Sequence, residues 1–302
     1  MNNSMSELWS RLGFLAIALV VYRIGTHIPI PGINPEQVAA LFQQSQGTIL
    51  QYFNLFSGGA LERMSIFALS VVPYISSAIV MQLFSNSVPY LQELKKDGQA
   101  GRNKITQYTR YGTVIFALIQ SSALTVTLQT AGLIDAGSIF SAFVAVISIV
   151  TGTMFLMWLG EQISERGIGN GISIIIATSI ITGVPRAFGQ ALEQTQQGDL
   201  NYLLLIVLAV LTLLVVAFVV FVENAQRKIT VNYAQRNQVR GMIQAPSSFL
   251  PLKLNMSGVI PAIFASTFFL FPASLSSWFG NIDGLGGLQE FSLYLNPGQP
   301  LY

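Results

Sequence analysis

The sequence has no cysteine and only one histidine, His27, among its 302 residues. The absence of cysteine excludes disulfides, thiol catalysis and Cys-ligated metals, and one histidine supplies neither a His cluster nor a Ser/His/Asp set. No nucleotide-binding loop of the form G-x-x-x-x-G-K-S/T occurs, and Gly167-Ile-Gly-Asn-Gly171 follows a polar turn, which favours a hinge or close-packing role for its glycines. We therefore predict no catalytic residues, no metal site and no cofactor, and we do not expect an enzyme.

Charged residues are scarce too, at 9% of the chain, whereas hydrophobic residues make up 52% and the mean hydropathy is +0.57. An ordinary soluble domain has about 25% charged residues, so the composition indicates a membrane protein whose spans need about 20 apolar residues each. Pro73 and Pro261 fall inside two spans, while Gly183 and Pro185 end a short fifth span. Such interrupted spans are typical of helices that line a path enclosed by protein. The predicted spans are residues 8–24, 65–84, 111–129, 139–160, 172–183, 203–222 and 258–278.

The basic residues follow the positive-inside pattern of membrane proteins. With the N-terminus inside, only Arg23, Arg63 and Arg186 of the 15 Lys and Arg residues lie on the outer side. No charged side chain lies near the middle of a predicted span, although ion-coupled carriers keep such groups there at a cost of at least about 2.5 kcal/mol. This distribution argues against an ion-coupled carrier and against a charge-filtered ion channel.

Two inner connections, residues 85–110 and 223–257, are long and basic. In the second, residues 227–233 alternate polar and apolar side chains, which predicts a strand or hairpin. Contact with anionic lipid head groups is sufficient to explain the sign of the charge. It does not explain the length of these connections, which favours docking surfaces for a cytosolic partner.

Residues 46–64, between the first two spans, are too short in their apolar part to cross a membrane. Ile49, Tyr52, Phe53 and Phe56 recur at helical spacing and precede a glycine pair, which predicts a short amphipathic helix. This helix is either an external helix on the membrane surface or a re-entrant segment tucked into the protein. The residues alone favour the surface helix.

Seven sequence strings, spread from the first predicted span to the last, carry a resemblance to a known family. They are Ile28-Pro-Ile-Pro-Gly-Ile33, Phe56-Ser-Gly-Gly59, Pro73-Tyr-Ile-Ser76, Gly101-Arg-Asn-Lys-Ile-Thr-Gln-Tyr-Thr-Arg-Tyr-Gly112, Gly152-Thr-Met-Phe-Leu-Met-Trp-Leu-Gly-Glu161, Arg166-Gly-Ile-Gly-Asn-Gly-Ile-Ser173 and Val259-Ile-Pro-Ala-Ile-Phe264. Together they resemble the bacterial SecY family, the central subunit of the Sec protein-conducting channel. The resemblance implies an all-α polytopic membrane protein with seven of the family's ten spans, the chain stopping where the eighth should begin. It assigns residues 1–183 to the N-terminal half and 184–302 to part of the C-terminal half, with a basic loop at 223–257 and an external tail at 279–302.

The resemblance also implies roles for individual residues. A collar of mostly aliphatic side chains closes the family's pore. Among the residues of this chain that match the collar, Val71 with Ile75 and Ile172 with Ile176 are spaced i,i+4, so that each pair lies on one helix face. Residues 48–60 resemble the plug, a short helix that fills the outer funnel of the resting channel, which overrides the preference for a surface helix. The implied residues are Val71, Ile75, Ile172, Ile176 and Ile263 in the pore ring; Phe53, Phe56, Ser57, Gly58 and Gly59 in the plug; Ser76 and Phe271 at the lateral gate; and Arg102, Lys104, Arg227, Lys228, Arg236 and Arg240 in cytosolic docking.

The implied function is a channel that passes unfolded secretory polypeptides across the bacterial inner membrane and membrane segments laterally into it, with the N-terminus cytoplasmic. The implied partners are SecE and SecG, the SecA ATPase, the ribosome, signal sequences, the translocating polypeptide and the lipid bilayer, with no direct nucleic-acid role in the pore. A multi-span small-solute secondary transporter is the main alternative, because it shares the broken helices, but it needs polar groups at mid-membrane. A membrane scaffold for partner helices is a third.

Overall fold

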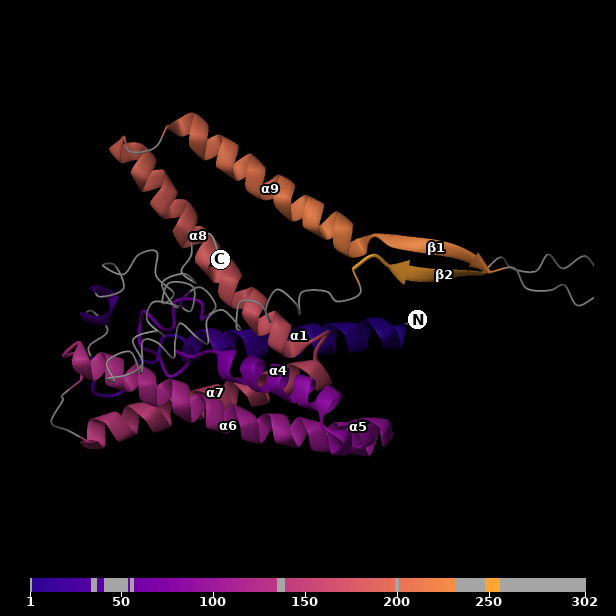
Figure 1. Ribbon diagram of the computed structural model, residues 1–302. Helices are drawn as coiled ribbons and strands as arrows, with labels where there is room; N and C mark the ends of the chain where they lie inside the picture. The colour runs from indigo at the N-terminus through magenta and orange to yellow at the C-terminus, as the bar shows by residue number, and fades with distance from the viewer. Residues whose placement is uncertain are drawn as a thin grey trace, which may run out of the picture. The chain divides into compact units, whose positions relative to one another are not determined.

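The computed structural model of the chain describes residues 2–33, 37–40, 54, 57–134, 139–198, 201–231 and 248–255. The chain divides into two compact units, Met1–Ala187 with Thr267–Tyr302, and Phe188–Ser266. Within the described residues, five helices are long and apolar enough to cross a membrane (Figure 1). The predicted seventh span and the predicted external tail lie outside the described residues.

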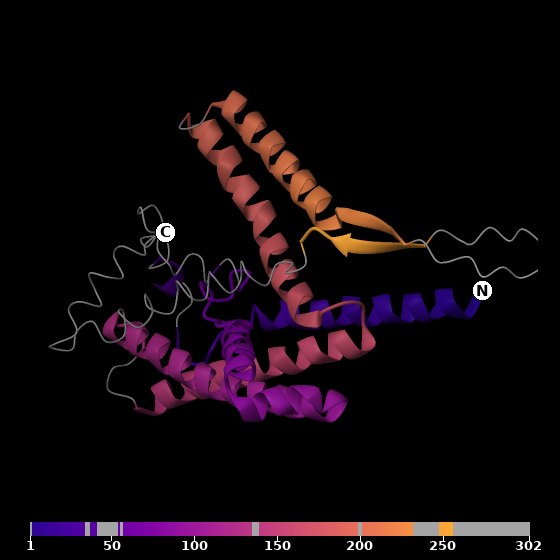
Figure 2. The same cartoon turned by 45° about the vertical axis from the view of Figure 1, so that its right-hand side comes forward.

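Helices dominate the first unit. Helix α6 packs against α4, α5 and α7, and α1 packs against α7 (Figure 2). Both α4 and α5 carry proline in the first turn, where its missing N–H removes no helical hydrogen bond. The helices are α1 (Asn2–Gly25), α4 (Val72–Ser87), α5 (Pro89–Lys96), α6 (Gly98–Thr130) and α7 (Ile139–Arg166), and α8 (Gly171–Gln197) begins in this unit.

The second unit holds the end of α8, helix α9 (Tyr202–Asn224) and an antiparallel hairpin of β1 (Gln226–Val231) and β2 (Ser248–Lys253). The side chain of Asn201 caps α9 by accepting the Leu203 N–H at 3.2 Å. In the hairpin, Lys228 Nζ lies 4.9 Å from the centre of the Phe249 ring, a cation–π contact. The strand predicted at residues 227–233 is confirmed as far as Val231.

The second predicted span begins later than the sequence suggested. Residues 57–71 form a series of turns, and α4 starts only at Val72, so Pro73 opens this helix instead of interrupting it. Met64 and Ser70 adopt positive φ angles of 43° and 51°, which no helix allows. The predicted start at residue 65 was therefore wrong, because tertiary contacts hold this apolar stretch out of the helical conformation.

The fifth predicted span is longer than the sequence suggested. Helix α8 continues through Gly183 and Pro185 to Gln197, so the predicted end at residue 183 was wrong. Proline removes only one backbone donor from the helix, and helices that cross membranes tolerate such a loss when neighbouring groups compensate. A short span is thus replaced by one of 27 residues.

The first basic connection, residues 85–110, is helical. It consists of the end of α4, all of α5 and the first turns of α6. Leu91 and Leu94 of α5 are buried. A β-carbon at Gly101 would overlap the Leu94 carbonyl oxygen, so a glycine is needed where α6 passes α5. Ser77 of α4 donates to the Thr109 carbonyl of α6 at 2.7 Å, which joins these two helices.

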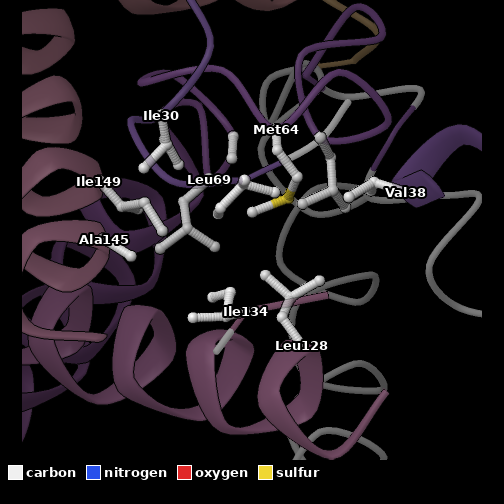
Figure 3. Packing of buried hydrophobic residues seen from close by; sticks show 11 residues of the cluster. Ile30, Val38, Met64, Leu69, Leu128, Ile134, Ala145 and Ile149 are labelled. Atoms are coloured by element: carbon white, nitrogen blue, oxygen red, sulfur yellow. The ribbon is translucent and has the colours of Figure 1, made fainter. Parts of the chain in front are cut away.

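The turn segment is enclosed by helices. Figure 3 shows one apolar cluster, in which Met64 and Leu69 meet Leu128 of α6 and Ile149 of α7. The Met64 carbonyl accepts the Ile30 N–H at 2.9 Å, so part of this buried backbone is hydrogen-bonded. Inside a membrane, tight packing of this kind, rather than exclusion of water, holds helices together.

Candidate functional site

Four of the five predicted pore residues belong to one apolar cluster, which we call the apolar ring: Val71, Ile75, Ile172 and Ile176. Val71 caps the start of α4 and is 1% exposed, and Ile176 of α8 is 9% exposed. Ile75 and Ile172 are partly buried against the same cluster. The fifth predicted residue, Ile263, lies outside the described residues. The first turns of two helices, separated by about a hundred residues of sequence, thus bring four aliphatic side chains into one cluster.

Glycines set the position of Ile172. A β-carbon at Gly160 of α7 would lie 2.6 Å from Ile172 Cδ1, and one at Gly171 would overlap the Gly160 carbonyl oxygen. Ser164 Oγ donates to that carbonyl at 2.9 Å and accepts the Gly171 N–H at 2.8 Å. The predicted close-packing role of the glycine-rich string is confirmed, because these residues let α7 and α8 meet at backbone distance.

A second feature is the outer segment, residues 57–63, which begins the turns before α4. Ser57 Oγ donates to the Asn54 carbonyl at 3.0 Å and accepts the Leu61 N–H at 3.1 Å. Gly58 and Gly59 have φ angles of +65° and +82°, a conformation that favours glycine, and the Gly59 N–H donates to the Asn54 carbonyl at 3.0 Å. The predicted plug residues Ser57, Gly58 and Gly59 lie here, whereas Phe53 and Phe56 lie outside the described residues.

The outer segment is docked on α1 and α8. Tyr22 of α1 is 1% exposed, and its hydroxyl bonds to Ser179 Oγ of α8 at 2.5 Å and donates to the Ser57 carbonyl at 3.4 Å. A β-carbon at Gly58 would lie 3.1 Å from Ser179 Cα and 3.2 Å from Thr182 Oγ1. Gly58 therefore serves both a left-handed turn and a close approach to α8.

The three arginines predicted on the outer side all lie around this segment. Arg186 makes a bidentate ion pair with Glu62, with N–O distances of 2.7 and 2.9 Å. Arg23 donates to the Gly58 carbonyl at 3.3 Å, and Arg63 Nη1 lies 3.0 Å from His27 Nε2. The contacts place these cations in the same part of the fold, as one membrane side requires. Neither Tyr22–Ser179 nor Glu62–Arg186 was predicted, because nothing in the sequence pairs residues 157 and 124 positions apart.

The surroundings of Glu62 hold its pKa below the ordinary value of 4.5, mainly through the hydrogen bond from Arg186 and secondarily through Asn54 and the charge of Arg63, against the opposing effect of burial. A carboxyl with a lowered pKa in the folded state contributes stability above its ordinary value, and this stability is lost as the pH falls through the folded pKa. Burial lowers the pKa of Arg63, and the nearby charge of Arg23 lowers it further. Arg63 and Arg186 both act on the single carboxylate of Glu62.

Acidification below pH 4.5 is therefore expected to weaken the attachment of the outer segment. The apparent unfolding temperature of the purified protein should be steady just above that pH and fall below it. In Glu62→Gln, that part of the acid-induced fall should be absent, and comparing the two proteins removes the contributions of the groups that they share. An identical acid profile for both would show that Glu62 makes no linked contribution.

One protein family matches most of the sequence. The family model described as SecY matches residues 65–302. The chain belongs to the SecY family. Two curated relatives named protein translocase subunit SecY, from Pseudomonas aeruginosa and Escherichia coli strain K12, are 57% identical over 300 residues and 55% identical over 302 residues. Each match covers 99% of this chain and 68% of the relative.

Solved structures share the fold. The structure described as "The structure of a protein conducting channel" has a TM-score of 0.65 and 18% identity, with 90% of this chain covered. The chain spans 59% of the length of that channel chain. "Sec61 in the Canine ribosome-channel complex from the endoplasmic reticulum" has a TM-score of 0.64 and the same coverage. The prediction of a SecY-type helical membrane bundle is confirmed.

The other predicted sites of this SecY-family chain are a lateral gate and a set of cytosolic docking residues. Ser76 of α4 is 7% exposed, and its Oγ donates to the Val72 carbonyl of its own helix at 3.2 Å, whereas Phe271 lies outside the described residues. The described docking residues, Arg102 and Lys104 on α6 and Arg227 and Lys228 on β1, are exposed; Arg236 and Arg240 lie outside. Among the residues that the structure describes, no three His, Asp or Glu side chains form a group that could hold a metal ion.

Proposed function

We propose that this chain forms the pore of a protein-conducting channel, in which unfolded polypeptides cross the membrane and apolar segments leave sideways into lipid. The apolar ring carries the proposal. Val71, Ile75, Ile172 and Ile176 lie in the first turns or at the cap of two helices and share one cluster. Aliphatic side chains of this kind close around a passing chain and exclude water from the gap, which blocks ions without binding the substrate strongly.

In the proposed channel, the other predicted parts surround this ring. The outer segment, with Gly58 at its turn, is the base of the plug, and Ile263 completes the chain's share of the collar. Ser76 and Phe271 border the lateral exit. The residues 1–183 and 184–302 belong to the two halves of the channel. Support comes from the family membership and from relatives named translocase subunits.

The channel makes no covalent change in its substrate, so external partners supply the energy. The exposed cations Arg102, Lys104, Arg227 and Lys228 offer docking sites for SecA or a ribosome, and SecE and SecG complete the complex. The proposed location is the bacterial inner membrane, with the N-terminus in the cytoplasm. The basic inner connections support that orientation.

A cross-linking experiment tests the proposal. These 302 residues contain no cysteine, so Ile75→Cys introduces the only thiol among them. With a second cysteine in a stalled secretory polypeptide, a disulfide between the two is expected in membranes, dependent on the motor or the ribosome. Ile181→Cys is the matched control and should give none, because Ile181 of α8 is 65% exposed and lies outside the apolar ring. No cross-link at Ile75→Cys, with that thiol still alkylated by small reagents, would favour a small-solute path and overturn the proposal.

A further inference from the structure

We propose that Tyr22, Glu62, Ser179 and Arg186 form an outer clasp that fastens the outer segment to α1 and α8 and sets how readily the resting channel opens. The inference rests on the proposed function and adds positioning residues to it. The clasp has a charged half, Glu62 with Arg186, and a buried half, Tyr22 with Ser179. Both halves join the outer segment to α8.

The charged half of the clasp is a bidentate ion pair. Arg186 offers both terminal nitrogens to the two carboxylate oxygens of Glu62, a paired arrangement that is stronger and more directional than one contact. Asn54 Nδ2 donates to Glu62 Oε2 at 3.1 Å, and the Glu62 N–H donates back to Asn54 Oδ1 at 3.0 Å. Through Glu62, Arg186 therefore holds both sides of the glycine turn.

The charge balance makes Glu62 the sensitive member. The Glu62 side chain is 12% exposed and that of Arg186 is 53% exposed, so water screens the carboxylate end of the pair less than it would screen a fully exposed pair. Arg23 contacts the same turn through the Gly58 carbonyl, and the charges of Arg63 and Arg186 both act on Glu62. Removing the carboxylate leaves three cations around one segment, so the segment is both released and repelled from α8.

The buried half connects the clasp with the apolar ring. The Tyr22 ring stacks on Phe67 with centroids 6.1 Å apart, and Phe67 lies in the turns that lead to Val71. Tyr22, Phe67, Val71 and Ile176 belong to one buried cluster. A displacement of the outer segment that breaks the Tyr22–Ser179 bond therefore disturbs the packing around the ring, because close-packed interiors transmit small shifts.

Resting ion conductance of the assembled channel complex in planar bilayers tests the charged half. Glu62→Gln and Arg186→Gln are each expected to raise it about tenfold, equivalent to about 1.4 kcal/mol. The swapped variant, Glu62→Arg with Arg186→Glu, should recover most of the seal, because the pair is restored.

The matched control is the ion pair of Arg110 with Glu161, which is also bidentate, with N–O distances of 2.8 and 2.9 Å, but joins α6 to α7. Arg110→Gln should lower thermal stability to a similar extent and leave resting conductance unchanged. Unchanged conductance in Glu62→Gln, or an equal rise in Arg110→Gln, would overturn the clasp.

A reversible cross-link between the outer segment and α8 tests the clasp by preventing it from opening. Glu62→Cys with Arg186→Cys, joined by a short bis-methanethiosulfonate, should stop polypeptide transport, and a reductant should restore it. Each single-cysteine variant treated with the same reagent is the control. Full transport through a channel shown to be cross-linked would refute the clasp and leave the proposed function intact. Failure of the unmodified channel to transport any polypeptide would instead refute the proposed function, and the conductance measurements would still decide on the clasp.

Discussion

Replacing Ile75 by asparagine is expected to raise the resting ion conductance of the assembled channel about tenfold, which corresponds to about 1.4 kcal/mol off the barrier to ions. Ile75 packs against the cluster that contains Val71 and Ile176. An amide at this position binds water, whereas an isoleucine side chain favours an apolar surrounding by about 2 kcal/mol. The constriction would then stay wet, and a hydrophobic gate that stays wet conducts.

Conductance in planar bilayers measures this effect, together with the transport of polypeptides that carry defective signal sequences, which should increase. Ile181→Asn makes the same chemical change on a side chain of α8 that is 65% exposed, and should leave conductance unchanged. Equal conductance of Ile75→Asn and the parent channel would exclude Ile75 from the ring.

Gly152→Ala is expected to destabilise the fold, although alanine is the better helix former by about 1 kcal/mol. Gly152 lies in α7, and a β-carbon there would overlap the Ile66 carbonyl oxygen and lie 3.2 Å from Phe67 Cδ1. The obstacle is backbone that is itself enclosed by helices, so it cannot move aside freely. Overpacking of this kind costs about 1–3 kcal/mol.

Thermal unfolding in detergent is the measurement for this variant, and resting conductance is a second one, because the turns pushed by the new methyl group lead to Val71. Gly13→Ala is the control. A β-carbon at Gly13 of α1 would meet no atom within 4 Å, so the change should be neutral or slightly stabilising. A Gly152→Ala protein as stable as the Gly13→Ala protein would contradict the close contact between α7 and the turns.

The sequence was most informative where one physical rule dominates. Charge placement put Arg23, Arg63 and Arg186 on one side of the membrane, and the structure collects all three around the outer segment. The i,i+4 spacing put Ile172 and Ile176 on one helix face, and they share a cluster with Val71. The alternation in residues 227–233 predicted the strand after α9, which the structure shows as far as Val231.

The sequence was least informative where distant residues decide local structure. Met64 and Ser70 adopt positive φ angles although neither is a glycine, so the sequence does not indicate this conformation. It arises because this segment is enclosed by α6 and α7. Pro185 lies within α8, which continues through it to Gln197. The clasp joins Glu62 to Arg186 across 124 positions, and only the folded chain reveals that these two charges meet.

Helix α6 is longer than a helix needs to be to cross a membrane. Its 33 residues make a rod of about 50 Å, whereas the hydrocarbon layer is about 30 Å thick. Arg102 and Lys104 lie near the N-terminal end of α6, and α5 packs against this helix. A tilt of about 5° around the far end moves the basic tip by about 4 Å. Because Ser77 of α4 donates to the Thr109 carbonyl of this rod, we expect a displacement of the basic tip to act on the helix that carries Ile75.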